Sequence, residues 1–170
     1  CGCTSLKSIV IPSWVKTVGM CAFDGCSALE KVELCEGIEE ISGFAFGGTA
    51  IHELVYPSTV TAVGDMCGPY SEALPNLAYV DLSKISMPVL KASFAGCPNL
   101  KTIVFPEDME ETWSYILGNC YAIEELVLPE GLKELGDLFY THEEEKSHLK
   151  RVVWPVSLLD GSAFRDCNEL

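Results

Sequence analysis

Basic side chains are scarce in this sequence. Eleven lysine and arginine residues stand against 25 aspartate and glutamate residues, which leaves a formal net charge of −14. A chain with that balance repels phosphate backbones and anionic lipid surfaces. We therefore predict that nucleic acid is not a partner.

Long apolar runs are missing as well. No segment approaches the roughly 18 consecutive apolar residues that a membrane-spanning helix requires. No amino-terminal stretch resembles a signal peptide. Residues 1–6 already belong to a repeated motif, so any export signal is expected upstream of them.

Motifs of catalysis are also absent. The sequence has no Gly-x-Ser-x-Gly elbow, no phosphate-binding glycine loop and no dinucleotide fingerprint. Residues 142–148 superficially resemble the metalloprotease motif His-Glu-x-x-His, but Lys146 stands where the second histidine is required. We interpret this segment as a solvated acidic loop, and we predict no enzyme activity, no catalytic residue, no cofactor and no metal site.

What the sequence does have is an internal repeat, which must be found before any fold is assigned. An apolar residue opens each unit, and by subtraction the spacings are 23, 22, 26, 23, 23, 26 and 21. These anchors are Leu6, Leu29, Ile51, Leu77, Leu100, Ile123, Leu149 and Leu170. Seven consecutive units therefore predict a solenoid.

Each unit begins with the same pattern. The fourth and sixth positions are always large and apolar, as in Leu6-x-x-Ile9-x-Ile11, and this alternation predicts a short strand with one buried face. Proline follows directly in five of the seven units and turns the chain off the sheet. A second apolar pair, such as Val15 and Val18, and a small-aromatic pair, such as Ala22-Phe23, close the core.

This template resembles the BspA-like leucine-rich repeat. Residues 6–29 carry it intact, as Leu-x-x-Ile-x-Ile-Pro, Val-x-x-Val-Gly and Ala-Phe-x-Gly-Cys-x-x-Leu. Ser83 departs from it in place of proline, and Trp113 and Leu117 stand where glycine and phenylalanine are expected. The resemblance implies a surface-displayed or secreted protein, adhesion to host proteins or other cells, and no enzymatic activity.

The predicted fold class is an α/β-type repeat solenoid, a leucine-rich repeat arc with one parallel strand per turn. The return segments, about a dozen residues each, are expected to hold a short helical turn, a 3₁₀ piece or a loop. Seven turns stacked at about 4.8 Å would extend roughly 34 Å along the axis. Residues 1–170 would form a single domain taken from a longer repeat array.

The third and fifth positions of each strand are predicted to point onto the inner face of the arc. This candidate partner-binding face comprises Ser8, Val10, Lys31, Glu33, Glu53, Val55, Tyr79, Asp81, Thr102, Val104, Glu125, Val127, Arg151 and Val153. An apolar valine stripe rimmed by Lys31, Tyr79 and Arg151 would suit a protein partner. Valine also suits any pleated strand, so a purely structural interpretation stays open.

Two units are three residues longer than the common 23, with the extra length near residues 65–76 and 137–148. Inserted loops often carry recognition, and their candidate contacts are Tyr70, Tyr140 and His142. Simple variation in loop length is the alternative interpretation.

Nine cysteines invite a redox or metal interpretation. Five occupy one repeat position, three residues before an anchor: Cys3, Cys26, Cys97, Cys120 and Cys167. We favour packing of a small apolar side chain in a repeated interior slot. Disulfides between adjacent turns, and a zinc site formed by Cys1, Cys3, Cys21 and Cys26, are the weaker alternatives.

The favoured function is a non-catalytic protein-binding or adhesion scaffold at the cell surface, with a host extracellular matrix or cell-surface protein as partner. The first alternative is a structural spacer that presents another domain. A second alternative is a carbohydrate-active β-helix enzyme, which would show three parallel sheets rather than one.

Overall fold

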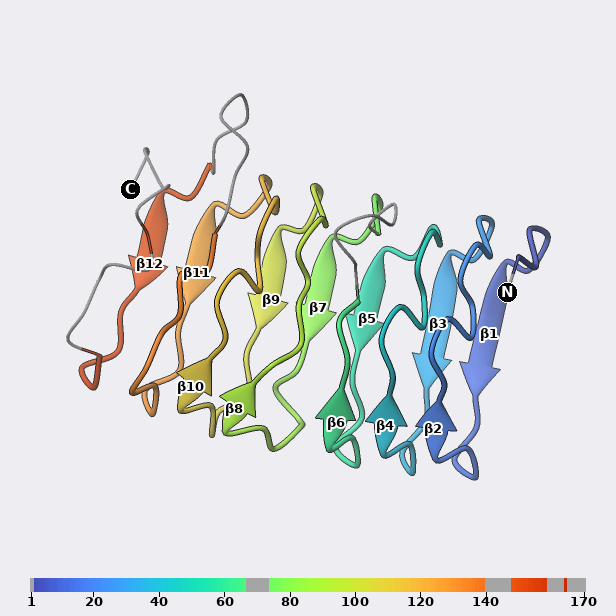
Figure 1. Cartoon of the computed structure of the whole chain (residues 1–170), viewed down its shortest axis with the longest axis horizontal. Helices are drawn as coiled ribbons and strands as arrows, with labels where there is room; N and C mark the ends of the chain where they lie inside the picture. The colour runs from blue at the N-terminus through green and yellow to red at the C-terminus, as the bar shows by residue number, and fades with distance from the viewer. Residues whose placement is uncertain (1, 67–73, 140–147, 159–163, 165–170) are drawn as a thin grey trace.

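The computed structural model describes residues 2–66, 74–139, 148–158 and 164, and in them the chain forms a parallel β-solenoid (Figure 1). One strand lies at each position where the repeat predicts it. These first-row strands are β1 (Ser8–Ile11), β3 (Lys31–Leu34), β5 (Glu53–Val55), β7 (Tyr79–Asp81), β9 (Thr102–Val104), β11 (Glu125–Val127) and β12 (Arg151–Val153). Seven such strands delimit six complete turns of the solenoid.

The register of the first row follows the repeat. Third positions pair with third positions, as in Ser8 with Lys31 and Tyr79 with Thr102. Continuous hydrogen-bonded sheets join β1 to β3, β5 through β7 to β9, and β11 to β12. The predicted parallel, in-register stack is confirmed, while the prediction of a single domain from a longer array stays a prediction.

A second row of strands occupies the return segments, where a short helical turn, a 3₁₀ piece or a loop was expected. It comprises β2 (Thr17–Val18), β4 (Glu40–Ile41), β6 (Ala62–Val63), β8 (Val89–Leu90) and β10 (Glu111–Thr112). The helical prediction is not confirmed in the described return segments. Their backbone groups bond to the neighbouring turn, as when the Ser42 N–H donates to the Val18 carbonyl at 2.9 Å, so the limb needs no helix to satisfy them.

The two rows run in opposite directions across each turn (Figure 1). Two rows, rather than the three that would favour a β-helix enzyme, occur in the described part of the chain. None of the described residues belongs to a helix long and apolar enough to cross a membrane.

The core lies between the two rows. The described anchors from the second unit onward are fully buried, namely Leu29, Ile51, Leu77, Leu100, Ile123 and Leu149. Aromatic rings fill the interior of successive turns, and the rings of Phe23 and Phe46 stack with centroids 5.6 Å apart and planes within 6°. In the fifth unit Leu117 takes the aromatic position and is equally buried. Each turn thus covers the open side of its neighbour.

Three cysteines of the predicted column belong to this core, whereas Cys3, in the first turn, is exposed and Cys167 lies outside the described residues. Cys26, Cys97 and Cys120 are at most 1% exposed, and no disulfide joins any of the cysteines within the described ranges. In the 22-residue unit Thr49 fills the slot, 2% exposed, and its hydroxyl donates to the Phe46 carbonyl at 2.8 Å. Replacement of cysteine by threonine in the same buried slot supports the packing interpretation of the column.

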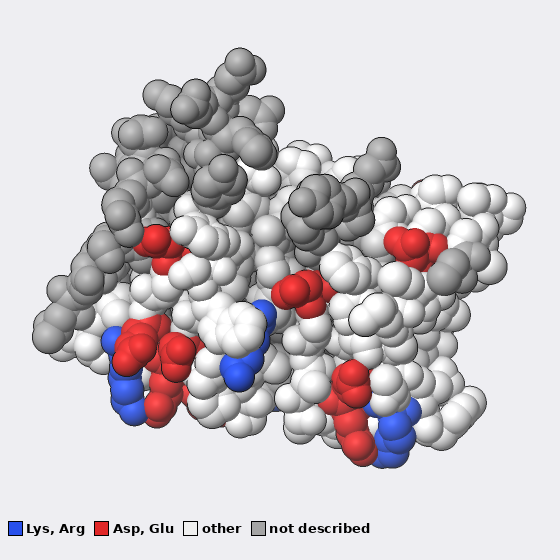
Figure 2. Space-filling view, viewed as in Figure 1, with Lys and Arg blue, Asp and Glu red and all other residues white. Residues whose placement is uncertain are grey.

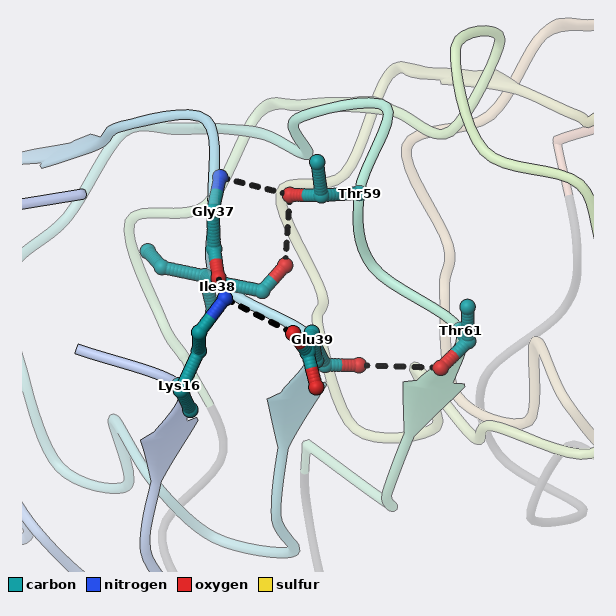
Figure 3. Close-up of polar contacts among 6 residues, drawn as sticks. All are labelled: Lys16, Gly37, Ile38, Glu39, Thr59 and Thr61. Atoms are coloured by element: carbon teal, nitrogen blue, oxygen red, sulfur yellow. Dashed lines mark hydrogen bonds and ion pairs between the residues drawn. The ribbon is translucent and has the colours of Figure 1, made fainter. Parts of the chain in front are cut away.

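Side chains also connect one turn to the next in the segments that join the first row of strands to the second. The Thr59 hydroxyl donates to the Ile38 carbonyl at 2.7 Å and accepts from the Gly37 N–H at 2.8 Å (Figure 3). Gly37 has a φ of 111°, and a Cβ placed on it would lie 2.3 Å from the Ser13 carbonyl oxygen. The backbones of the first two turns approach closely here because Gly37 has no side chain.

Candidate partner-binding face

All fourteen residues predicted for the inner face lie in first-row strands and share one side of the sheet. The burial pattern alternates along most of these strands, as in β5 and β11, where a buried leucine lies between two exposed residues. Tyr79, Asp81, Val104 and Val153 are half-buried, and the other ten are exposed. The repeat therefore brings together one continuous surface from residues more than 140 positions apart in the chain.

The valine stripe on this face is interrupted. Val10 is 55% exposed but pairs in register with Glu33, and Val55 pairs with Asp81. Val127 is 54% exposed and pairs with Val153, and Val104 holds the same position in the preceding turn, so valines follow one another only toward the carboxyl-terminal end of the face. The structure offers a mixed surface with small apolar patches.

A hydrogen-bonded group centred on Asp81 lies near the middle of the face. Its carboxylate accepts from the Ser83 N–H at 2.9 Å, from the Ser83 hydroxyl at 2.6 Å and from the Tyr79 hydroxyl at 3.3 Å. Partial burial raises the pKa of Asp81, but the bonds from Ser83 and Tyr79 outweigh it and the net pKa is lowered. Burial, followed by the Asp81 charge, raises the pKa of Tyr79, which stays a donor.

This group explains a departure from the repeat. Ser83 stands where five units have proline, and proline could not supply the N–H that Asp81 accepts. The other unit without proline has Cys35 there and also an acidic fifth position, Glu33. The Asp-x-Ser pattern was a signal for this local structure that the sequence analysis missed.

We expect Ser83→Ala to raise the pKa of Asp81 toward its ordinary value of 3.8, because the variant loses the hydroxyl donor. A lowered folded-state pKa stabilises the protein above pH 3.8, and this stabilisation is lost as the pH falls through the folded-state pKa. The difference in free energy of unfolding between wild type and variant should therefore shrink on acidification. Carbon-13 NMR titration of the carboxyl groups measures the pKa directly.

Ser58→Ala is the matched control. Two hydrogen bonds from Ser58, one from its side chain and one from its backbone, lower the pKa of Glu36. Removing the Ser58 hydroxyl should raise the pKa of Glu36 and leave Asp81 unchanged. An Asp81 pKa that is the same in wild type and Ser83→Ala would contradict the assignment.

Basic groups at the carboxyl-terminal end of the face are paired across adjacent strands. The Arg151 guanidinium lies 2.8 Å from the Glu125 carboxylate, its register partner, and Lys150 lies 3.4 Å from Glu124. All four side chains are about half exposed or more, so these pairs contribute little to stability. Lys31 makes none of the ion pairs found in the described part of the chain.

A shallow depression marks the face between β9 and β11, which belong to separate hydrogen-bonded sheets. It is lined by Lys101, Thr102, Ala122, Glu124, Glu125 and Val127. Thr102, Glu125 and Val127 were predicted for the face, whereas the second-position residues Lys101 and Glu124 were not. Side chains of the second position therefore extend the face beyond the strands themselves.

The model of the BspA-type leucine-rich repeat region matches the sequence in six copies, over residues 1–77 and 72–170. The chain belongs to this family. No curated protein matches it.

Solved structures of bacterial proteins are similar to this chain. The leucine-rich repeat protein of Treponema pallidum is 27% identical over 72% of this chain and 67% of its own, with a TM-score of 0.52. A leucine-rich cell surface protein of Faecalibacterium prausnitzii matches 97% of this chain at 20% identity and a TM-score of 0.45, and the pneumococcal vaccine antigen PcpA matches 94% at 16% and 0.39. The BspA-type chain spans 58% of the length of each of the latter two.

The inner face of the BspA-type solenoid is less negatively charged than the rest of the described surface. With its second positions included, the inner face carries five basic and six acidic side chains, a net charge of −1, whereas the described residues together hold nine basic and 18 acidic side chains, a net charge of −9. Those of the inner face are Lys7, Lys31, Lys101, Lys150 and Arg151 against Glu30, Glu33, Glu53, Asp81, Glu124 and Glu125. Within the described residues, a net charge of −8 therefore lies off the inner face.

Several of the other predicted site residues lie outside the described part of the chain. Tyr70, Tyr140 and His142 lie outside the described residues, as does Cys1 of the zinc alternative. Within the described residues no group of three or more His, Cys, Asp or Glu side chains could hold a metal ion.

Proposed function

We propose that this BspA-type repeat is a non-catalytic scaffold that binds a protein partner on its inner face, at the cell surface or outside the cell. The observation that carries the proposal is the continuous surface of seven strands, on which exposed valines alternate with charges of both signs. Such a mixture is typical of protein interfaces that form and separate. Family membership supports the surface location and the adhesive role.

The inner face does not need a basic partner, because its own charge is nearly balanced. The proposed partner is an extracellular matrix or cell-surface protein of a host. Exposed Val127 and the neighbouring Val153 would supply apolar contact, and the paired Arg151 and Glu125 would supply polar contacts at its edge. Charged contacts at the edge of an interface influence specificity and association rate more than raw affinity.

Arg151→Glu should weaken partner binding at least about tenfold, which corresponds to about 1.4 kcal/mol, because it places a second carboxylate beside Glu125 on the proposed face. Binding to immobilised fibronectin, laminin and collagen by surface plasmon resonance provides the measurement. Lys31→Glu, at the other end of the face, should act in the same direction.

Lys16→Glu is the matched control. Lys16 also forms a 2.8 Å ion pair with a glutamate of the adjacent turn, Glu39, and its side chain is 61% exposed. This variant makes the same change of charge and breaks an equivalent pair away from the inner face. Equal weakening in Lys16→Glu and Arg151→Glu would reject the inner face as the docking surface.

A structural spacer would behave differently. Replacing these turns within the full-length protein by an unrelated solenoid of similar length would preserve the function of a spacer. Loss of adhesion on that replacement, together with the Arg151→Glu effect, supports a binding role.

A further inference from the structure

The second row of strands carries an aromatic surface that the repeat does not require. Trp113 follows β10 at a position where other units have glycine, including Gly64 and Gly136, and it is 52% exposed. Tyr115, two residues further on, is 50% exposed. A large aromatic side chain in place of glycine, directed at solvent, contributes little to the core of its own turn.

The register shows what surrounds the Trp113 ring. Thr112 is buried and pairs with Leu90, so Trp113 aligns with Lys91 of the preceding turn, whose ammonium lies 5.3 Å from the ring centroid. Trp113 aligns in the following turn with Gly136, which has no side chain to cover the ring from that side. A Cβ added to Gly136 would lie 2.7 Å from the Ser114 nitrogen.

The register places two carboxylates on the same face of the second row as the ring. Glu111 is two residues before Trp113 and therefore points to the same face, and its bridge partner in the next turn is Glu134. Like charges directly opposite each other on adjacent strands are unfavourable. A cation placed between Glu111 and Glu134 would relieve that repulsion.

The wider surroundings are acidic. The described carboxylates of this part of the chain are Glu107, Asp108, Glu110, Glu130 and Asp137 in addition to Glu111 and Glu134. Lys133 is paired with Glu110 at 2.8 Å, Lys91 lies over the ring, and Lys84 stands one turn before Glu107 at the same repeat position, so seven carboxylates face three basic groups here. In Figure 2 acidic side chains gather at the lower left, with basic groups to either side, in the region where β10 lies in Figure 1.

We propose that Trp113, Glu111 and Glu134 form a docking site for an arginine-bearing segment of a protein partner, distinct from the inner face. A planar guanidinium stacks on an indole ring and bonds carboxylates in a fork geometry, which an ammonium cannot do. The Lys91 contact shows that the ring already attracts a cation. Charge complementarity selects the occupant, because a second copy of this chain would bring another net charge of −14.

A ten-residue peptide of alternating arginine and glycine, labelled with a fluorophore, is the probe. Fluorescence anisotropy at physiological salt should show Trp113→Gly weakening its binding at least about tenfold, and Trp113→Phe weakening it less because a ring remains. The glycine variant restores the residue that the repeat has elsewhere, so it should fold, as circular dichroism and its melting temperature would verify. The equivalent lysine peptide should bind more weakly than the arginine peptide.

A matched pair of double variants separates this site from general attraction to an acidic protein. Glu111→Gln with Glu134→Gln should weaken binding at least about fivefold, whereas Glu30→Gln with Glu33→Gln, an identical change of net charge on the inner face, should change it less than twofold. Equal effects of the two double variants would overturn the proposal, as would unchanged binding by Trp113→Gly. A shift of the wild-type oligomeric state in Trp113→Gly, measured by sedimentation, would overturn it in favour of self-contact.

Discussion

Gly37→Val should disrupt the stacking of the first turns and cost at least about 3 kcal/mol of the free energy of unfolding. The φ of 111° at Gly37 lies in a region that residues with a Cβ rarely adopt. The new Cβ would also lie 2.3 Å from the Ser13 carbonyl oxygen, a backbone atom that cannot move aside without shifting its whole turn. Chemical denaturation followed by circular dichroism measures the loss.

The Gly37→Val substitution should destabilise the first turns more than the distant ones, because each turn of a solenoid contacts only its neighbours. Hydrogen exchange in Gly37→Val should show loss of amide protection in β1 through β4, with protection kept in β9 and β11. Two hydrogen bonds at Thr59 depend on the same segment, since its hydroxyl bonds both Gly37 and Ile38 (Figure 3). The second and third turns should therefore loosen together.

Gly131→Ala provides the matched control for a glycine of the same repeat position. Gly131 has no positive φ, and a Cβ on it would lie 3.8 Å from its nearest neighbour, the Met109 carbonyl oxygen, which is ordinary contact. This variant should change stability by less than about 1 kcal/mol, and it could even stabilise the fold by restricting the unfolded chain. Equal losses at Gly37 and Gly131 would show that the close approach at Ser13 is not the cause.

The first row of strands could be predicted from the sequence because it depends on a pattern within each unit. Alternating apolar positions fix which side of a strand is buried, and the constant spacing fixes the register between turns. Ser8 therefore meets Lys31, and Glu125 meets Arg151, as the repeat requires. The Glu125–Arg151 ion pair could have been predicted by comparing the third positions of adjacent units.

The second row could not be predicted in the same way. Its strands are two residues long, too short for an alternating pattern, and their hydrogen bonds go to another turn. The apolar pairs such as Ile38 and Ile41 were recognised in the sequence, but their spacing of three also fits a helical turn. Only the stacking of neighbouring turns decides between these alternatives.

The same difference decides which candidate site could be predicted from the sequence. Residues of the inner face follow from the alternation of the first row, so their common location was predictable. The surface around Trp113 was not, because it arises from a departure from the repeat and depends on which residues of the second row align. Its signal in the sequence was a tryptophan at a glycine position, which we noted only as a departure from the repeat.

Phe46→Ala should be among the most damaging truncations of a core side chain, costing about 3–5 kcal/mol of the free energy of unfolding. Phe46 is fully buried, its ring stacks on that of Phe23, and the Phe23 N–H donates to the Ala45 carbonyl at 2.7 Å beside it. Removing the ring leaves a cavity between two turns that the stacked backbones cannot close. Urea unfolding followed by circular dichroism gives the free energy change.

Phe46→Leu tests whether the position needs an aromatic ring or only a filled volume. Leu117 occupies the equivalent slot in the fifth unit without exposure, and the Phe94 N–H donates to the Ile116 carbonyl beside it at 2.8 Å, as Phe23 does to Ala45. The leucine variant should therefore cost about 1.5 kcal/mol or less. Losses of similar size for leucine and alanine would mean that ring stacking with Phe23, rather than the filling of the interior, holds these turns together.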